Sequence, residues 1–116
     1  MAISEPYELD GVTVTTASIS IPSGTSTPST ITDDGVYQLW VDASAMAKGD
    51  EYSIQILEKV EGTGGTQRQV FKAVLTDIQV ENFVTPMLIL INGWDMIIDK
   101  VAGADAAFDA SIRKVA

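Results

Sequence analysis

The chain has 116 residues, of which 46% are hydrophobic, and its 16 acidic residues against 7 basic ones give a formal net charge of −9. It contains no cysteine and no histidine, which excludes disulfide frameworks, the usual zinc ligand sets and catalysis by either residue type. The length corresponds to one domain. Because the acidic balance repels phosphate groups, we expect neither nucleic acid nor an anionic membrane as a partner.

Neither a membrane span nor a secretory signal is expected. The longest uninterrupted apolar run, residues 87–91, has five residues, far fewer than the roughly 20 that cross a bilayer as a helix. The amino-terminal MAISEPYELDG carries acids where a secretory signal has basic residues and an apolar stretch. We therefore expect synthesis in the cytoplasm.

Strand patterns begin early in the chain, while helix signals are almost absent. Residues 12–21 are rich in Val, Ile and Thr but change phase near Thr15 and Thr16. This predicts either a bulge within one strand or two short strands. Residues 22–32, rich in Ser, Thr, Pro and Gly, predict a surface loop.

Alternating apolar residues predict three further strands, over residues 36–42, 51–60 and 66–77. The side chains expected on their buried faces are Tyr37, Leu39, Val41, Tyr52, Ile54, Ile56, Val60, Phe71, Ala73 and Leu75. Trp40 and Val36 lie on the opposite face of the first strand. The glycine-rich residues 61–65 predict a hairpin between the second and the third.

The strongest local turn signal follows. Residues 87–91 and 94–101 flank Asn92-Gly93, the dipeptide best suited to a two-residue type I′ hairpin. Residues 87–91 are apolar at every position, which predicts a central strand covered on both faces. After a turn at 102–105, residues 107–115 predict the last strand.

About seven or eight strands with mainly hairpin connections predict an all-β fold. The architecture expected is an antiparallel β-sandwich, either jelly-roll-like or immunoglobulin-like. The first ten residues contain Pro6 and three acids, which cannot complete a sheet pattern. We therefore expect an N-terminal arm over residues 1–11, disordered or ordering on a partner, and one β-sandwich domain over residues 12–116.

No pattern in the sequence predicts catalysis, a metal site or a cofactor. Asp95 and Asp99 share one strand face and could bind Ca²⁺ or act as acid and base in glycoside hydrolysis. The favoured interpretation is that they are solvated acids on a sheet face. Residues 62–65 lack the Lys-Ser/Thr of a phosphate-binding loop, and no residue pattern activates a hydroxyl nucleophile. We expect a protein that is not an enzyme.

The two tryptophans are candidate contact residues. Trp40 and Trp94 could stack on sugars, although a buried or interface position is more common for tryptophan. Trp40 lies opposite a buried triad, so a neighbouring subunit could cover it. With Tyr7 and Leu9 of the expected arm, Trp40 and Trp94 form the candidate interface.

Six short segments between residues 33 and 115 carry a family resemblance. They are DGVYQLWV at 34–41, Gly49-Asp50-x-Tyr52, Glu58-Lys59-Val60, Gly65-Thr66-Gln67-Arg68, Leu90-x-x-Gly93-Trp94-Asp95 and Ser111-Ile112-Arg113-Lys114-Val115. They resemble small proteins encoded among the structural genes of tailed bacteriophages. These segments contain no chemical motif, so the resemblance implies a virion structural protein and no reaction.

The resemblance implies a head decoration (cement) protein on the outside of the capsid. Such a protein would be made in the host cytoplasm, associate with itself as a homotrimer and bind the major capsid protein. Two alternatives remain open. One is another virion component of the tail, connector or baseplate, and the other is a carbohydrate- or receptor-binding β-sandwich that uses an exposed Trp40 or Trp94.

Overall fold

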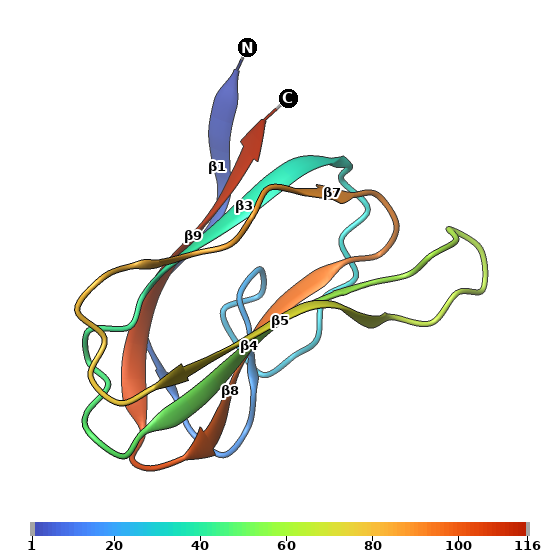
Figure 1. Ribbon diagram of the computed structural model, residues 1–116. Coiled ribbons are helices and arrows are strands. Elements are labelled where there is room, and N and C mark those ends of the chain that lie inside the picture. Colours follow the sequence, from blue (N-terminus) through green and yellow to red (C-terminus); the bar gives the residue numbers. More distant parts are fainter. Residues whose placement is uncertain (1, 116) are drawn as a thin grey trace.

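The computed structural model describes residues 2–115, which form β-strands and loops without a helix (Figure 1). Two antiparallel sheets pack face to face. The five-stranded sheet has the order β1-β9-β3-β6, with β7 also pairing with β3, and the four-stranded sheet has the order β2-β8-β4-β5. The strands are β1 Ile3–Val14, β2 Ile19–Ser20, β3 Gly35–Asp42, β4 Glu51–Glu58, β5 Arg68–Thr76, β6 Phe83–Val84, β7 Leu88–Leu90, β8 Asp95–Ala102 and β9 Ala106–Val115.

The strand order distinguishes the two sandwich topologies that the sequence leaves open. β6 and β7 pair with different parts of β3, so together they occupy one position in the five-stranded sheet. The chain then crosses repeatedly between the sheets, and its last strand lies between the first and the third. This is a jelly-roll arrangement. The predicted all-β antiparallel sandwich is confirmed, in its jelly-roll form.

The inner faces of the two sheets form the core. Alternate residues of β3 and β4 are at most 1% exposed, as the sequence predicts, namely Tyr37, Leu39, Val41, Tyr52, Ile54 and Ile56. Burying a side chain of this size contributes about 1.5–3 kcal/mol. Val60 is 91% exposed because β4 ends two residues earlier, so its predicted burial is wrong.

Trp94 is buried where the first strand, the third strand and the long loop meet. Its ring centroid lies 4.5 Å from that of Tyr37 and 6.0 Å from that of Tyr7. Its indole N–H donates to the carbonyl oxygen of Asp33 at 3.1 Å, and its backbone exchanges two hydrogen bonds with Ile31. Trp94 therefore ties both the loop and β1 to the core.

The residues expected to form an arm complete the five-stranded sheet. β1 pairs with β9 along its length, and Ile3 lies opposite Val115, so the beginning of β1 and the end of β9 are side by side (Figure 1). Two bulges interrupt the register, and Pro6 lies in the first of them. Leu9 is only 4% exposed. The prediction that these residues cannot complete a sheet is wrong for residues 3–10, because the bulges disturb the alternation by which a strand is predicted; residue 1 lies outside the described residues.

Asn92-Gly93 does not form the predicted hairpin. The strand before it, β7, pairs with β3 in one sheet, whereas the strand after it, β8, belongs to the other sheet. Gly93 has φ +53°, but Asn92 does not have the positive φ that a type I′ turn requires. β7 is an edge strand in which Ile89 is 73% exposed, so the predicted central strand is also wrong.

A buried carboxylate holds the Ser/Thr-rich loop against β8. Asp95 is 1% exposed, and its two oxygens accept hydrogen bonds from the Ser20 hydroxyl at 2.8 Å and the Ser29 backbone N–H at 3.1 Å. Burial raises the pKa of the Asp95 carboxyl, and these hydrogen bonds oppose the shift. The interpretation of Asp95 as a solvated acid is wrong, whereas Asp99 is half-buried on the same strand.

A second carboxylate, Asp50, joins two turns at the other end of the molecule. Its oxygens accept hydrogen bonds from the backbone N–H groups of Ala47 at 2.8 Å and Ala104 at 2.9 Å. These bonds lower the pKa of Asp50. Gly103, with φ +93°, lies directly against Asp50, so close that an added Cβ would be 2.7 Å from the Cα of Asp50.

We expect Gly103→Ala to destabilise the fold more than Gly64→Ala. Both glycines have positive φ, +93° and +72°, a conformation that costs other residues about 1–2 kcal/mol. A methyl group at Gly103 would also collide with the Asp50 backbone, whereas nothing lies within 4 Å at Gly64. Urea unfolding measures both free energies. Equal losses would contradict the close approach at Gly103.

We expect Asp50→Asn to make stability less sensitive to acid. A carboxyl whose pKa is lowered on folding stabilises the protein above its unfolded-state pKa, ordinarily 3.8, and this contribution is lost as the pH falls through the native pKa. The variant should therefore melt below the wild type at neutral pH, and the two melting temperatures should converge in acid. Circular dichroism across a pH series measures this. A constant difference would show that the Asp50 charge contributes nothing.

Candidate functional site

An apolar row crosses the outer face of the five-stranded sheet, the face that points away from the other sheet. The register places Ile3, Val115, Val36 and Ile89 directly opposite one another on β1, β9, β3 and β7. Ile3 is 69% exposed and Ile89 is 73% exposed, while the two valines between them are half-buried. We call these four residues the apolar row.

The apolar row borders an open hollow of about 520 Å³, which is lined by Val36, Ile89, Ile91 and Val115 together with Asp34, Gly35 and Lys114. Met87 and Ile91, 58% and 51% exposed, extend the apolar surface along the chain beside β7. The nearest basic group is already paired, because the Lys114 Nζ lies 2.9 Å from the Asp33 Oδ2. This end of the sheet therefore offers apolar contact in a sparsely charged setting.

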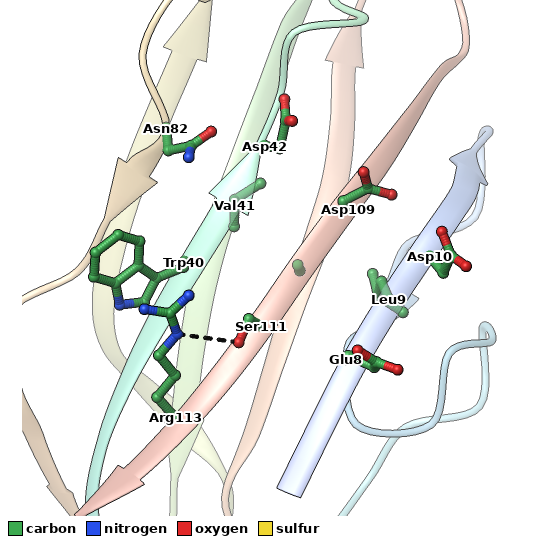
Figure 2. Close-up of a pocket in the computed structure, with 11 residues that line it drawn as sticks. Glu8, Leu9, Asp10, Trp40, Val41, Asp42, Asn82, Asp109, Ser111 and Arg113 are labelled. Carbon is green, nitrogen blue, oxygen red and sulfur yellow. Dashed lines mark hydrogen bonds between the residues drawn. The ribbon is translucent and has the colours of Figure 1, made fainter. Parts of the chain in front are cut away.

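Further along the same face, a groove of about 430 Å³ passes Trp40 (Figure 2). The Arg113 guanidinium lies over the indole, 4.0 Å from the ring centroid, and the indole N–H donates to the Gln38 Oε1 at 3.0 Å. The Arg113 Nε donates to the Ser111 hydroxyl at 3.3 Å. An exposed cation–π contact of this kind contributes about 0.5–1 kcal/mol. The stack holds Trp40 on the sheet and covers one side of its ring.

Four acidic side chains line the groove beyond Trp40, namely Glu8, Asp10, Asp42 and Asp109 (Figure 2). The Asp109 Oδ1 accepts a hydrogen bond from the Gly11 backbone N–H at 2.7 Å. Hydrogen bonds from Ser44 lower the pKa of Asp42. The outer face thus passes from an apolar end, through the Trp40–Arg113 stack, to an acidic end.

The structure separates the four candidate interface residues. Trp40 lies half-buried on the outer face of the sheet, and Tyr7 is half-buried against Trp94. Leu9 is 4% exposed and Trp94 is 0% exposed, so both belong to the core and present no surface to a partner. Trp40 alone belongs to the outer face that the phase of its strand predicted.

Sequence reasoning missed the apolar row. Its two central members, Val36 and Val115, occupy outward positions in strands whose other positions are strongly apolar, and Ile89 was assigned to a buried central strand. The phase of its strand places one member, Val36, on the face opposite Tyr37 together with Trp40, but gives no sign of the other three. The row as a whole follows only from the register of β1, β9, β3 and β7, which are separated along the sequence.

The outer face carries groups that can bind a partner by non-covalent contact: apolar side chains, an indole, a guanidinium and carboxylates. Among residues 2–115, no three acidic side chains come together in a way that could hold a metal ion. The same residues include no helix long and apolar enough to cross a membrane.

Comparisons with known proteins give structural neighbours alone. No protein-family model and no curated protein matches the chain. One neighbour is the Eiger TNF from S. frugiperda, with 15% identity and a TM-score of 0.46 over 78% of this chain and 66% of that one. A second is a xylan-binding domain of carbohydrate-binding module family 22, with 14% identity and a TM-score of 0.45 over 85% of this chain and 64% of that one. A third is the C-terminal family 22 module of Clostridium thermocellum Xyn10B, with 14% identity and a TM-score of 0.44 over 73% of this chain and 57% of that one. The chain thus spans 57–66% of the length of these neighbours. These likenesses concern the fold, and no function is taken from them.

Trp40 and Trp94 should differ in their accessibility to a soluble quencher. Trp94 is 0% exposed, so a Trp40→Phe variant should emit at short wavelength and be quenched weakly by acrylamide. A Trp94→Phe variant leaves Trp40 at the surface and should show a quenching constant several-fold higher. Circular dichroism confirms that each variant is folded. Strong quenching of folded Trp40→Phe would contradict the burial of Trp94.

Proposed function

We propose that this chain is a structural protein of a tailed-phage virion, a decoration protein on the outside of the head. It associates with copies of itself and binds the major capsid protein through the outer face of its five-stranded sheet. The apolar row carries this proposal, because an exposed apolar surface rimmed by polar residues is typical of a protein–protein contact. The segments at 34–41 and 111–115, which carry the family resemblance, include three residues of this face: Val36, Trp40 and Val115.

A rigid sheet face is well suited to binding a repeated surface. Backbone hydrogen bonds fix the spacing of the apolar row, so little conformational freedom is lost when it is covered. Stable specific contacts bury about 1,200–2,000 Å². A capsid presents many identical sites, and linked copies gain affinity because neighbouring contacts form together.

The acidic end of the face has a role in this proposal as well. Glu8, Asp10, Asp42 and Asp109 repel nucleic acid, so a decoration protein with this surface does not compete for the packaged genome. The same charges restrict the orientation in which a partner can dock, since a partner surface must avoid placing acids opposite them.

A second candidate function is carbohydrate binding at the Trp40 groove. An indole beside carboxylates and the Asn82 amide in an open groove is a set of groups that sugars can use. Arg113 already covers one side of that ring, and Trp94 is buried. Glycan-array binding that disappears in Trp40→Ala, together with unchanged attachment to heads, would favour this function over the first. Another virion component of the tail, connector or baseplate differs from a decoration protein in its lower copy number per particle.

Ile89→Asp should weaken attachment to phage heads. Heads are assembled from the major capsid protein of the phage that encodes this chain, without the chain itself, and each purified variant is sedimented with them. The aspartate places a charge at the most exposed position of the apolar row, so retention should fall at least tenfold. Val80→Asp is the matched control, since Val80 is 90% exposed and lies outside the apolar row. Equal binding by the wild type and both variants would overturn the proposal.

Deletion of the first ten residues is not a suitable test of attachment. These residues supply Tyr7 and Leu9 to the interior and Ile3 to the apolar row. Their removal would therefore alter the fold and the contact surface together, whereas the point substitutions at Ile89 and Val80 change exposed side chains.

A further inference from the structure

The sandwich has two long free strand edges, one in each sheet. β1 is the end strand of the five-stranded sheet and β5 is the end strand of the four-stranded sheet. Within residues 2–115, each has a hydrogen-bonded neighbouring strand on one side alone. They contain 12 and 9 residues. Free edges of this length display backbone N–H and C=O groups that can pair with another chain.

The two edges carry opposite charges. β1 contains Glu5, Glu8 and Asp10 and no basic residue, whereas β5 contains Arg68 and Lys72 and no acidic residue. All five side chains are exposed. The ion pairs found within residues 2–115 use Lys100 and Lys114, so neither basic residue of β5 has an ion-pair partner among those residues. β5 therefore holds two of the 7 basic residues of a chain whose net charge is −9.

Charge distinguishes the three ways in which two copies could join these edges. Pairing β1 with β1 would set three acids against the same three acids. Pairing β5 with β5 would set Arg68 and Lys72 against themselves. Only the pairing of β1 with β5 places opposite charges across the contact. Opposite charges on facing strands stabilise a sheet, while like charges destabilise it.

We propose that copies of this chain join edge to edge, with β1 of one copy pairing with β5 of the next. The contact is heterologous, since each copy contributes two different edges. β1 continues into β2 and β5 continues into β6, the respective end strands of the opposite sheets, so the two edges lie on opposite sides of the sandwich. One copy can therefore contact two neighbours, which produces a ring or a filament and not a two-fold dimer.

The regular stretches of the two edges determine where the contact is centred. β5 is in unbroken register with β4 from Phe71 to Thr76 and contains no proline. In β1, Pro6 lacks an N–H and the bulges interrupt the register, which leaves Tyr7–Leu9 as a regular stretch. Glu8 is in the middle of this stretch, so we place it beside Lys72 of the next copy.

This inference supplies the surfaces for the self-association that the proposed function includes, and it is tested apart from attachment to heads. Sedimentation velocity at low ionic strength should show an oligomer for the wild type. Glu8→Lys and Lys72→Glu should each raise the dissociation constant at least tenfold. Lys48→Glu makes the same charge change as Lys72→Glu, at an exposed residue outside both edges. It should leave the oligomer unchanged.

Restoration of assembly distinguishes edge pairing from a general effect of charge. The double variant Glu8→Lys/Lys72→Glu reverses both sides of the contact and should assemble again. An equimolar mixture of the two single variants should also assemble, because each positive edge of one variant meets a negative edge of the other. Copies then alternate, so closed rings formed by the mixture contain an even number of chains.

Three outcomes would overturn the edge pairing. One is a wild-type chain that stays monomeric, another is an oligomer that neither substitution affects, and the third is a two-fold dimer. Each of them leaves the attachment of the apolar row to heads to be decided by the Ile89→Asp experiment. Loss of head attachment in Ile89→Asp with an intact oligomer would support both inferences separately. Circular dichroism establishes that every variant retains the β-sheet signal.

Discussion

The pairing of β1 with β9 determines most of what this protein presents to its surroundings. It joins the first described strand to the last in an antiparallel register. On the inner side it places Leu9 in the core and Tyr7 against Trp94. On the outer side it brings Ile3 to the end of the apolar row, and it leaves β1 as an end strand that carries Glu5, Glu8 and Asp10. Core, contact face and charged edge all depend on this one pairing.

The sequence predicts strands well where burial of a single face makes residue types alternate, as in Tyr37, Leu39 and Val41. It does not reveal which strands pair, because each pairing joins residues that are remote along the chain. The Asn-Gly hairpin prediction is wrong for this reason, because a local preference for a turn is overridden when its flanking strands belong to different sheets. The arm prediction is wrong because two bulges disturb the alternation of β1. Of the candidate interface residues, the sequence places only Trp40 correctly on the outer face. It cannot identify Ile89, because an apolar run such as residues 87–91 has the same residue pattern whether its second face is buried in the fold or exposed to a partner.

The distribution of the few basic residues is as informative as the net charge of −9. Lys100 and Lys114 form ion pairs within the chain, and Arg113 stacks on Trp40. Lys48 and Lys59 lie outside the strands, so among the described strands β5 is the one whose basic residues have no partner of this kind. Copies of an acidic protein repel one another at long range, so association between them requires local apolar contact or local opposite charge. The apolar row supplies the first and the β1 and β5 edges supply the second.

The two contacts use different directions and different forces. The apolar row faces outward from a sheet, whereas the free edges lie at its sides, so a copy can use both at once. Salt screens the attraction between charged edges, since the Debye length falls from about 10 Å at 0.1 M to about 3 Å at 1 M ionic strength, while apolar burial does not weaken in this way. A ring built through the edges presents one apolar row per copy, related by the rotation of the ring. Attachment of one row then holds the others close to neighbouring sites, and the ring binds a repeating surface more tightly than a single copy without any additional kind of contact.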